Sequence, residues 1–393
     1  MIDGWEIKKI SDVCIVISGQ SPESKYYNKD GEGLPFYQGK KEFTKKTIGK
    51  PKTWTTKVTK EAFEGDILMS VRAPVGPVNL CQQHSCIGRG LAAIRSSDKI
   101  DNDHLFNFLV KYESEIVGNS GAVFNSINKT QISNIEIPVP PIEEQKEIVE
   151  ILDKTFESIK KAKANIQKNI ENANELFQSK LNQIFSQTGD DWENNALIDF
   201  CKFIDYRGKT PKKTQRGIKL ITAKNVRMGY LRDNPQEFID LNDYDKWMTR
   251  GIPKKGDVLF TTEAPLANVT LLNTSEKIAL AQRIITLCPD RSLVIGEFLC
   301  YCLQSKIVQD KIIDNGSGAT VTGIKSKLLK KIKVPITHLK KQKEIVETLD
   351  ILYNHIQSLL ASYEEELENL EDLKKSILQK AFSGELTNKN KAA

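Results

Sequence analysis

Two segments of this 393-residue sequence concentrate side chains that can neutralise phosphate groups. Gln38–Lys60 holds eight lysines and a single acid, Glu42, and Tyr206–Arg232 holds nine lysines and arginines and no acid. Aromatic residues such as Trp54 and Tyr230 lie among them. Lysine and arginine in loops bind the phosphates of DNA, and arginine, glutamine and asparagine also read base edges in the major groove. A single charged run is usually a solvated face. Two such runs at corresponding places in a duplicated chain predict contact with double-stranded DNA.

The predicted DNA-binding residues share a cationic or amide side chain within these segments. They are Gln38, Lys40, Lys41, Lys45, Lys46, Lys50, Lys52, Lys57, Lys60, Arg207, Lys209, Lys212, Lys213, Arg216, Lys224, Asn225 and Arg227. Their chemistry makes Gln38, Arg207, Lys224, Asn225 and Arg227 the candidates for base readout, and the other lysines and arginines the candidates for backbone contact. A third basic stretch, 325–341, suits either DNA or an acidic partner.

Motifs of nucleotide and methyl-transfer chemistry are missing from the sequence. An adenine methyltransferase needs Asn or Asp before Pro-Pro and an aromatic residue after it. The only Pro-Pro, Pro140-Pro141, has neither. No phosphate loop of the G-x-x-x-x-G-K-[ST] type and no G-x-S-x-G element is present. The seven cysteines form no C-x-x-C pair and offer no zinc-binding spacing.

A nuclease would need clustered acids that hold metal ions. Asp66 and Asp257 recur in a Gly-Asp-aliphatic-Leu element, but Glu263 of the second copy faces Arg72 in the first. Copies that disagree on a needed acid are poor catalytic candidates, and Gly-Asp before a strand is typical of a turn. We therefore expect a binding protein with no catalytic residue, no metal and no cofactor of its own.

The elements that position these residues occur twice. Gln145–Glu150 and Gln342–Glu347 are identical, 197 residues apart, whereas Trp5 and Trp192 are 187 apart. Further matches keep the same order, with an offset that grows in small steps, as loop insertions within one fold would produce. The chain is an internal duplication.

Each copy begins with a mixed α/β domain. Short β-branched runs separated by Gly, Pro and Asn predict strands, and longer apolar-periodic runs predict helices. The predicted strands include Val13–Ile17, Asp66–Val71, Asp257–Thr262 and Ile284–Leu287, and the predicted helices are Asp103–Val117 and Gly296–Ile313.

A long helix follows each domain. Apolar residues recur every three or four positions between Pro141, which suits the first helical turn, and about residue 186, and again from about 338 to Gly384. Such stripes predict that the two helices, each roughly 65 Å long at 1.5 Å per residue, pair as an antiparallel coiled coil. We expect an α/β (α+β) protein with a first domain at 1–140, a helix at 141–188, a second domain at 189–337, a helix at 338–384 and a tail at 385–393.

Composition limits the class of protein. Neither an N-terminal signal peptide nor an apolar run long enough to span a membrane is found, which predicts a cytoplasmic protein. The net charge of +6 agrees with a polyanionic partner.

The joins between domain and helix carry a resemblance. Residues 137–149 read Ile-Pro-Val-Pro-Pro-Ile-Glu-Glu-Gln-Lys-Glu-Ile-Val, and 334–346 read Val-Pro-Ile-Thr-His-Leu-Lys-Lys-Gln-Lys-Glu-Ile-Val. This architecture resembles the specificity subunit of Type I restriction–modification systems over the whole chain. Ile336-Thr337 departs from the usual Pro-Pro, which we expect to alter only the start of the helix.

The resemblance implies a non-catalytic subunit whose two target-recognition domains read the two halves of a bipartite, asymmetric DNA site. The paired helices would set the spacer and dock two modification (methyltransferase) subunits, and ATP-dependent restriction subunits would join the complex. S-adenosylmethionine, ATP and Mg would then belong to those partners. Three alternatives remain at this point. They are a DNA-binding adaptor of a related defence system without Type I partners, a self-contained nuclease or methyltransferase, and a coiled-coil scaffold with incidental basic loops.

Overall fold

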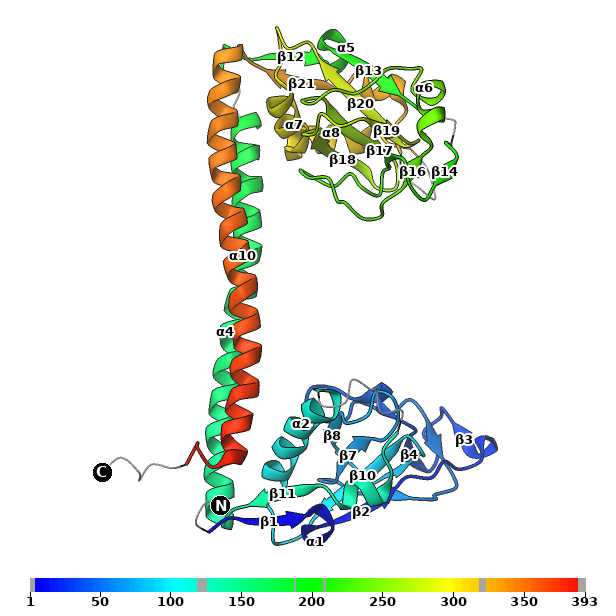
Figure 1. Cartoon of the computed structure of the whole chain (residues 1–393), viewed down its shortest axis with the longest axis vertical. Helices are drawn as coiled ribbons and strands as arrows, with labels where there is room; N and C mark the ends of the chain where they lie inside the picture. Colours follow the sequence, from blue (N-terminus) through cyan, green and yellow to red (C-terminus); the bar gives the residue numbers. More distant parts are fainter. Residues whose placement is uncertain (1–3, 119–125, 187–188, 208–209, 318–322, 388–393) are drawn as a thin grey trace, which may run out of the picture. The chain divides into compact units, whose positions relative to one another are not determined.

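The computed structural model describes residues 4–118, 126–186, 189–207, 210–317 and 323–387 (Figure 1). The chain divides into two compact units. The first comprises Met1–Ile166 and Glu365–Ala393, and the second comprises Gln167–Glu364. Each unit therefore contains one globular domain together with parts of both long helices.

The first domain is built on three sheets. The two-stranded sheet pairs β1 (Glu6–Lys9) with β11 (Glu136–Val139). The four-stranded sheet has the order β2 (Cys14–Ser18), β10 (Leu91–Ser96), β7 (Ile67–Ser70), β8 (Val78–Leu80). The five-stranded sheet has the order β3 (Tyr27–Asn28), β5 (Trp54–Thr55), β4 (Leu34–Tyr37), β9 (Ser85–Ile87), β6 (Glu61–Ala62). The helices are α1 (Ile10–Val13), η1 (Ser24–Tyr26), η2 (Lys40–Glu42), α2 (Asn102–Gly118) and α3 (Lys129–Ser133).

Alternation along the strands explains the layers of this domain. Successive side chains of a strand point to opposite faces of its sheet. On β7, Ile67 and Met69 join the core that contains α2 and the long helices, whereas Leu68 joins a smaller core with Tyr37 and Ile87 of the five-stranded sheet. The four-stranded sheet is thus buried on both faces.

The second domain repeats this plan. Its two-stranded sheet pairs β12 (Glu193–Ala196) with β21 (Lys333–Ile336), and its first four-stranded sheet has the order β13 (Cys201–Asp205), β20 (Ile284–Pro289), β17 (Val258–Thr262), β18 (Leu266–Leu271). Its other sheet has the order β14 (Lys213–Thr214), β16 (Phe238–Ile239), β15 (Ile218–Ile221), β19 (Ile278–Leu280). The helices are α5 (Leu197–Phe200), η3 (Leu241–Asp243), α6 (Tyr244–Trp247), α7 (Gly296–Gln304), α8 (Lys306–Asp314) and α9 (Ser326–Leu329).

The strands that the two domains share agree in order and in pairing, and β6 of the five-stranded sheet has no counterpart in the sheet that contains β14 to β16 and β19. β4 pairs with β9 in parallel, and β15 pairs with β19 in parallel at the matching place. The α/β fold and the duplication are confirmed. One detail of the sequence prediction is wrong: the helix expected over 296–313 is two helices, because the backbone at Ser305 is extended (φ −66°, ψ 143°).

The long helices are α4 (Ile142–Ser186) and α10 (Leu339–Ser383). In the first unit, Ile148 and Leu152 near the start of α4 share a core with Leu378 and Phe382 near the end of α10. In the second unit the end of α4 packs against the start of α10, where Phe177 lies 5.5 Å from Tyr353 between ring centroids. Both units therefore show antiparallel pairing. Gly384, at φ +75°, follows the last helical residue as a left-handed C-terminal cap. Within the described residues, no helix is apolar over a length that would cross a bilayer.

Candidate nucleic-acid interface

The basic segment of the first domain follows β4 and contains β5 of the five-stranded sheet. Its eight lysines are all exposed. Lys40 and Lys41 lie on η2, Lys45 and Lys46 lie in the bend between the bridged residues Phe43 and Ile48, and the rest flank β5. Those flanking residues are Lys50 and Lys52 before β5, and Lys57 and Lys60 after it. Gln38 is also exposed, directly after β4.

One lysine of this segment already has an acidic partner in its own domain. The ammonium of Lys46 lies 3.0 Å from Oδ1 of Asp103 and 5.9 Å above the ring of Phe106. The ammonium of Lys57 lies 5.1 Å above the ring of Tyr26. Lys46 is therefore a weaker candidate for phosphate contact than its neighbours.

The basic segment of the second domain occupies the sheet that contains β14 and β15. Lys212, Arg216 and Lys224 are exposed, the last of them in the turn that follows β15. Lys213 is exposed on β14, and its ammonium lies 2.7 Å from Oε2 of Glu237. Lys209 lies outside the described residues.

The prediction that Asn225 reads a base is wrong. Its side chain is 1% exposed. Oδ1 accepts hydrogen bonds from the backbone N and the hydroxyl of Thr222 at 3.0 and 2.8 Å. Nδ2 donates to the carbonyls of Arg232 and Pro235 at 3.1 and 3.0 Å. With every hydrogen-bonding position used inside the protein, Asn225 fixes the turn after β15 and has none left for DNA.

Arg207 and Arg227 are also tied to their own domain. The guanidinium of Arg207 forms a bidentate pair with Asp205, at 2.9 Å from Nε to Oδ1 and 2.7 Å from Nη2 to Oδ2. Burial acts to raise the pKa of Asp205, but the hydrogen bonds and charge of Arg207 lower it overall, so the carboxylate of Asp205 stays ionised at neutral pH. Arg227 donates to the carbonyl of Val226 at 3.1 Å. Both arginines are half-buried, and each keeps only part of its donor capacity for a ligand.

Each domain also has a shallow cleft at the end of its four-stranded sheet, which the sequence did not reveal. In the first domain the cleft measures about 250 Å³, and its walls include Arg72, Arg89 and Lys129, all exposed. Among the described residues, no acidic side chain lines it. Gly90 N donates to the carbonyl of Gln38 at 3.1 Å, so the cleft adjoins the start of the lysine-rich segment. The three cationic side chains of the cleft therefore lie beside the start of the segment, and the cleft and the segment are together named the basic surface of this domain.

The second domain has its cleft, of about 300 Å³, at the corresponding place. The backbone N of Thr262 donates to the carbonyl of Arg283, as that of Val71 donates to Gly90 in the first domain. Here the walls include Arg207, Gln282 and Lys325, and Glu263 is paired with Arg283 at 2.9 Å. Arg283 has a φ of +74°, in the left-handed region of the backbone, which residues other than glycine rarely adopt. Such residues are often found at functional sites. The same place thus presents different polar groups in the two copies.

The recurring acid of the Gly-Asp element is structural. Asp66 is 3% exposed, accepts a hydrogen bond from Phe63 N at 2.8 Å, and accepts two more from Nε and Nη2 of Arg95, each at 2.8 Å. Asp257 accepts from Lys254 N at 2.8 Å in the same way. The turn interpretation of both aspartates is confirmed. Among the described residues, no three His, Cys, Asp or Glu side chains are grouped so as to hold a metal ion.

The fold and the clefts define a class of protein: a duplicated α/β protein with paired long helices, in which each copy has a polar cleft lined by different side chains. The family model of the Type I restriction modification DNA specificity domain matches residues 2–172 and 189–369, so the chain belongs to that family and carries the domain twice.

Curated relatives agree with this family. The putative type I restriction enzyme MjaX specificity subunit of Methanocaldococcus jannaschii is 44% identical over 179 residues, which is 42% of this chain and 42% of that protein. The type I restriction enzyme MjaVIII specificity subunit of the same organism is 24% identical over 99% of this chain and 94% of its own. The EcoBI specificity subunit of Escherichia coli is 21% identical over 98% and 87%.

Solved structures share the fold. A chain in a structure of a type I R-M system has a TM-score of 0.76 at 19% identity, covering 97% of this chain and 98% of that chain. The HsdS subunit from Thermoanaerobacter tengcongensis has a TM-score of 0.61 at 18% identity, covering 98% of both.

Proposed function

We propose that this chain is the DNA-recognition subunit of a Type I restriction–modification complex, and that each globular domain reads one half of a bipartite, asymmetric site. The observation that carries the proposal is the pair of clefts. One backbone frame, repeated in the two domains, presents arginine and lysine in one copy and a mixture of Arg, Gln, Lys and Glu in the other. Side chains of different hydrogen-bonding character at one docking position read different bases.

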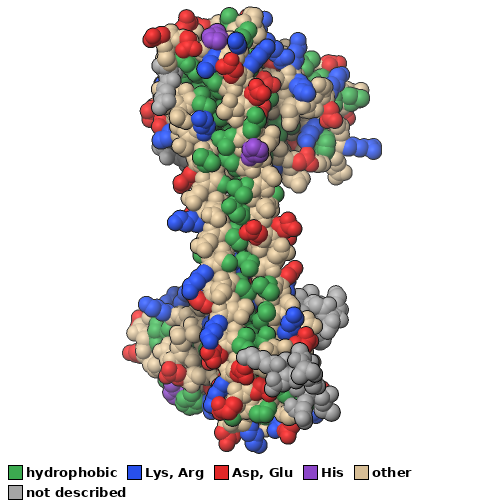
Figure 2. Space-filling model, turned by 90° about the vertical axis from the view of Figure 1, so that its left-hand side faces the viewer, with side chains coloured by type: hydrophobic (Ala, Val, Ile, Leu, Met, Phe, Trp, Pro, Cys, Tyr) green, Lys and Arg blue, Asp and Glu red, His purple; other side chains and the backbone are tan. Residues whose placement is uncertain are grey.

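The paired helices supply the surface for modification subunits in this proposal. In the first unit Leu373 of α10 is 44% exposed, and in the second unit Leu176 of α4 and Ile351 and Leu359 of α10 are 42–55% exposed. Figure 2 shows hydrophobic side chains following the faces of these helices. Exposed apolar side chains that follow one surface are typical of a protein interface. Two modification subunits, with restriction subunits joining them, would cover it.

Methylation and cleavage belong to those partners in this proposal. S-adenosylmethionine, ATP and Mg would bind to the modification and restriction subunits, and this chain would contribute target choice and the distance between half-sites. The basic surface would position the backbone of the duplex, while the cleft residues would contact base edges.

The test is to map methylated adenines in DNA from cells that carry this gene with its neighbouring genes. Arg72→Ala with Arg89→Ala should change the bases required in one half-site only, and Arg283→Ala with Lys325→Ala should change the other half only. Replacing two lysines of α4, Lys154→Ala with Lys168→Ala, removes the same charge away from the clefts and should leave both halves intact. A cleft variant that leaves the methylated sequence unchanged, or that alters both halves together, would contradict the assignment.

A further inference from the structure

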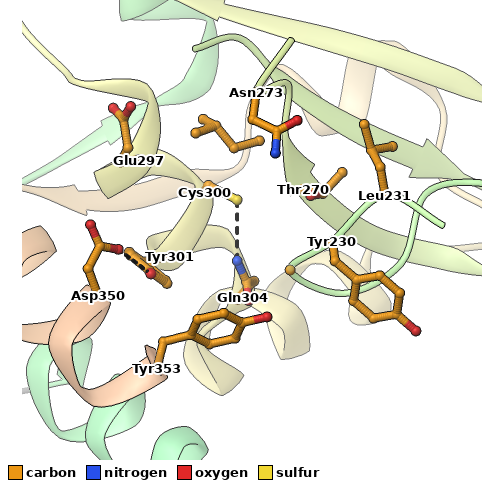
Figure 3. A pocket seen from close by; sticks show the side chains of 12 residues that line it. Tyr230, Leu231, Thr270, Asn273, Glu297, Cys300, Tyr301, Gln304, Asp350 and Tyr353 are labelled. Atoms are coloured by element: carbon orange, nitrogen blue, oxygen red, sulfur yellow. Dashed lines mark hydrogen bonds between the residues drawn. The ribbon is translucent and has the colours of Figure 1, made fainter. Parts of the chain in front are cut away.

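A second kind of pocket, of about 430 Å³, opens in the second unit between α7, β18, the loop at 229–231 and the first third of α10 (Figure 3). Glu297 and Asp350 lie on one side of it, and Tyr230 and Leu231 on the other. The ring of Tyr353 completes the wall between them. The pocket therefore combines two carboxylates with aromatic and aliphatic carbon, outside the cleft assigned to DNA.

The polar groups of this pocket are only partly satisfied by one another. The hydroxyl of Tyr301 donates to Oδ1 of Asp350 at 2.5 Å, and Nε2 of Gln304 donates to the sulfur of Cys300 at 3.2 Å. Burial raises the pKa of Tyr301, and the bond to Asp350 raises it further, so the hydroxyl remains a donor. Across the described part of the chain, no lysine or arginine forms an ion pair with Glu297 or Asp350, in contrast to exposed acids such as Asp310 and Glu344, which pair with Lys306 and Lys341.

In the first domain, the ammonium of Lys46 occupies the place that corresponds to this pocket. Gln145 Oε1 accepts from Asp101 N at 2.7 Å, as Gln342 Oε1 accepts from Ile295 N at 3.0 Å. This equivalence sets Asp103 of α2 at the position of Glu297 of α7, and likewise Phe106 at the position of Cys300.

The loop beside that position also corresponds. The backbone at Lys46 pairs with β8, where its carbonyl accepts from Leu80 N at 2.8 Å. The backbone at Gly229 pairs with β18, where its N donates to the carbonyl of Val269 at 2.8 Å, two residues before the position that matches Leu80. In the first domain this loop sends the ammonium of Lys46 to Asp103, at 3.0 Å, above the ring of Phe106. In the second domain the loop carries Gly229 and Tyr230, which bring no charge. The first copy thus supplies its own cation at a place where the second copy has acids and no internal cation.

We propose that the pocket of the second domain binds the ammonium or guanidinium group of a lysine or arginine side chain from a partner polypeptide. Tyrosine faces attract a cation, the carboxylates neutralise it, and the apolar walls fit the alkyl stem that precedes it. Ile351, which follows Asp350 on α10, is 53% exposed. A cation pocket beside an exposed apolar residue suits a protein interface better than a free amine. The inference rests on the proposed function, because the complex supplies the partner.

The first arm of the test measures the pocket alone. The full-length chain, labelled with 3-fluorotyrosine, is titrated with N-acetyl-arginine methylamide and N-acetyl-lysine methylamide, and with N-acetyl-norleucine methylamide as the neutral control. We expect saturable ¹⁹F shifts at Tyr230, Tyr301 and Tyr353 with the cationic probes only. Glu297→Gln with Asp350→Asn should weaken this binding at least tenfold, whereas Asp245→Asn with Glu276→Gln, the same charge change at exposed acids outside the pocket and the paired helices, should not.

The internal comparison gives a second variant that does not touch the pocket. Lys46→Ala vacates the position beside Asp103 in the first domain, and should raise the number of cationic probe molecules bound per chain from one to two. An unchanged number would contradict the equivalence of the two positions.

The second arm uses the complex with the modification subunits. The Glu297→Gln, Asp350→Asn chain should bind those subunits at least tenfold more weakly than the wild type and the matched control. Probe binding with unchanged assembly would overturn the partner assignment in favour of a free amine, and absence of probe binding would overturn the pocket itself. Methylation of the same DNA site by the assembled variant would leave the proposed function standing in either case, so the two failures are distinguishable.

Discussion

The buried amide of Asn225 allows the sharpest separation of structural from DNA-reading residues. Asn225→Ala removes four hydrogen bonds, two to Thr222 and one each to the carbonyls of Arg232 and Pro235. At about 1 kcal/mol for each bond, with the hydroxyl of Thr222 free to find another partner, the loss is about 3–4 kcal/mol of local stability. The equilibrium constant for local opening of the sheet that contains β15 and β19 should therefore rise roughly a hundred- to thousandfold.

Hydrogen exchange of the full chain measures this directly, because local opening reports the stability of one region without requiring the whole chain to unfold in two states. Amides of β15 and β19 should exchange faster by roughly that factor in Asn225→Ala, while those of the first domain stay unchanged. Lys224→Ala, the exposed neighbour, should leave exchange as in the wild type. If Asn225→Ala preserved protection and changed the methylated half-site, Asn225 would be a base reader and the reasoning from burial would fail.

Three further predictions follow from particular contacts. Lys45→Ala should reduce the slope of log K against log salt concentration for DNA binding by about 0.9, the counterion release expected for one phosphate contact. Lys46→Ala should change this slope by much less, because its ammonium already pairs with Asp103. Equal slopes for the two variants in titrations from 50 to 200 mM salt would refute the distinction. Deleting one heptad within 155–180 together with the antiparallel partner segment should shorten the spacer of the methylated site by about three base pairs, because seven residues rise roughly 10 Å. Both half-sites should stay the same. An unchanged spacer in sequencing would contradict the proposal that the helices set the distance between half-sites. Burial lowers the pKa of His104 to about 4 from its ordinary 6.5, so between these pH values the unfolded chain binds a proton that the folded chain excludes. The free energy of unfolding should therefore fall by about 3 kcal/mol as the pH drops from 6.5 to 4. In thermal unfolding, His104→Phe, which copies Phe298 of the second domain, should reduce this pH dependence, and an unchanged dependence would show that another group causes it.

The regular parts of the fold were predictable because their signals are local. The long helices come from a three- and four-residue periodicity that extends over more than 40 residues, and their observed bounds, Ile142–Ser186 and Leu339–Ser383, lie within three residues of those expected. Repetition of Gln145–Glu150 at Gln342–Glu347 was enough to show the duplication. The break at Ser305 was not visible, because a serine in an otherwise helical pattern carries no strong stop signal.

The recognition surface was predictable only in part. Charge density located the exposed lysines, but burial decides whether a polar side chain faces DNA or the protein, and burial is a property of tertiary packing. Asn225 and Lys224 are adjacent in sequence and chemically plausible alike, yet one is enclosed and the other exposed. The clefts were invisible for a related reason. Arg72, Arg89 and Lys129 are separated in sequence and meet only after β7, β10 and α3 have assembled.

One mismatch between the copies was visible in the sequence, and its meaning changed with the structure. Arg72 opposite Glu263 counted against a shared catalytic acid. In the folded chain Arg72 and Glu263 line two equivalent clefts, and opposite charge at one position agrees with the proposal that the two half-sites differ. The same comparison applies to the pocket beside α7. In the first domain the loop places Lys46 against Asp103, whereas in the second domain the matching loop carries Tyr230 and places no cation against the acids of the pocket. A duplicated frame keeps its backbone contacts equal, so a change of charge at an equivalent place reports a change of ligand rather than a change of fold. By that criterion the two proposals assign the copies different ligands at two separate positions, the cleft beside the four-stranded sheet and the pocket beside α7.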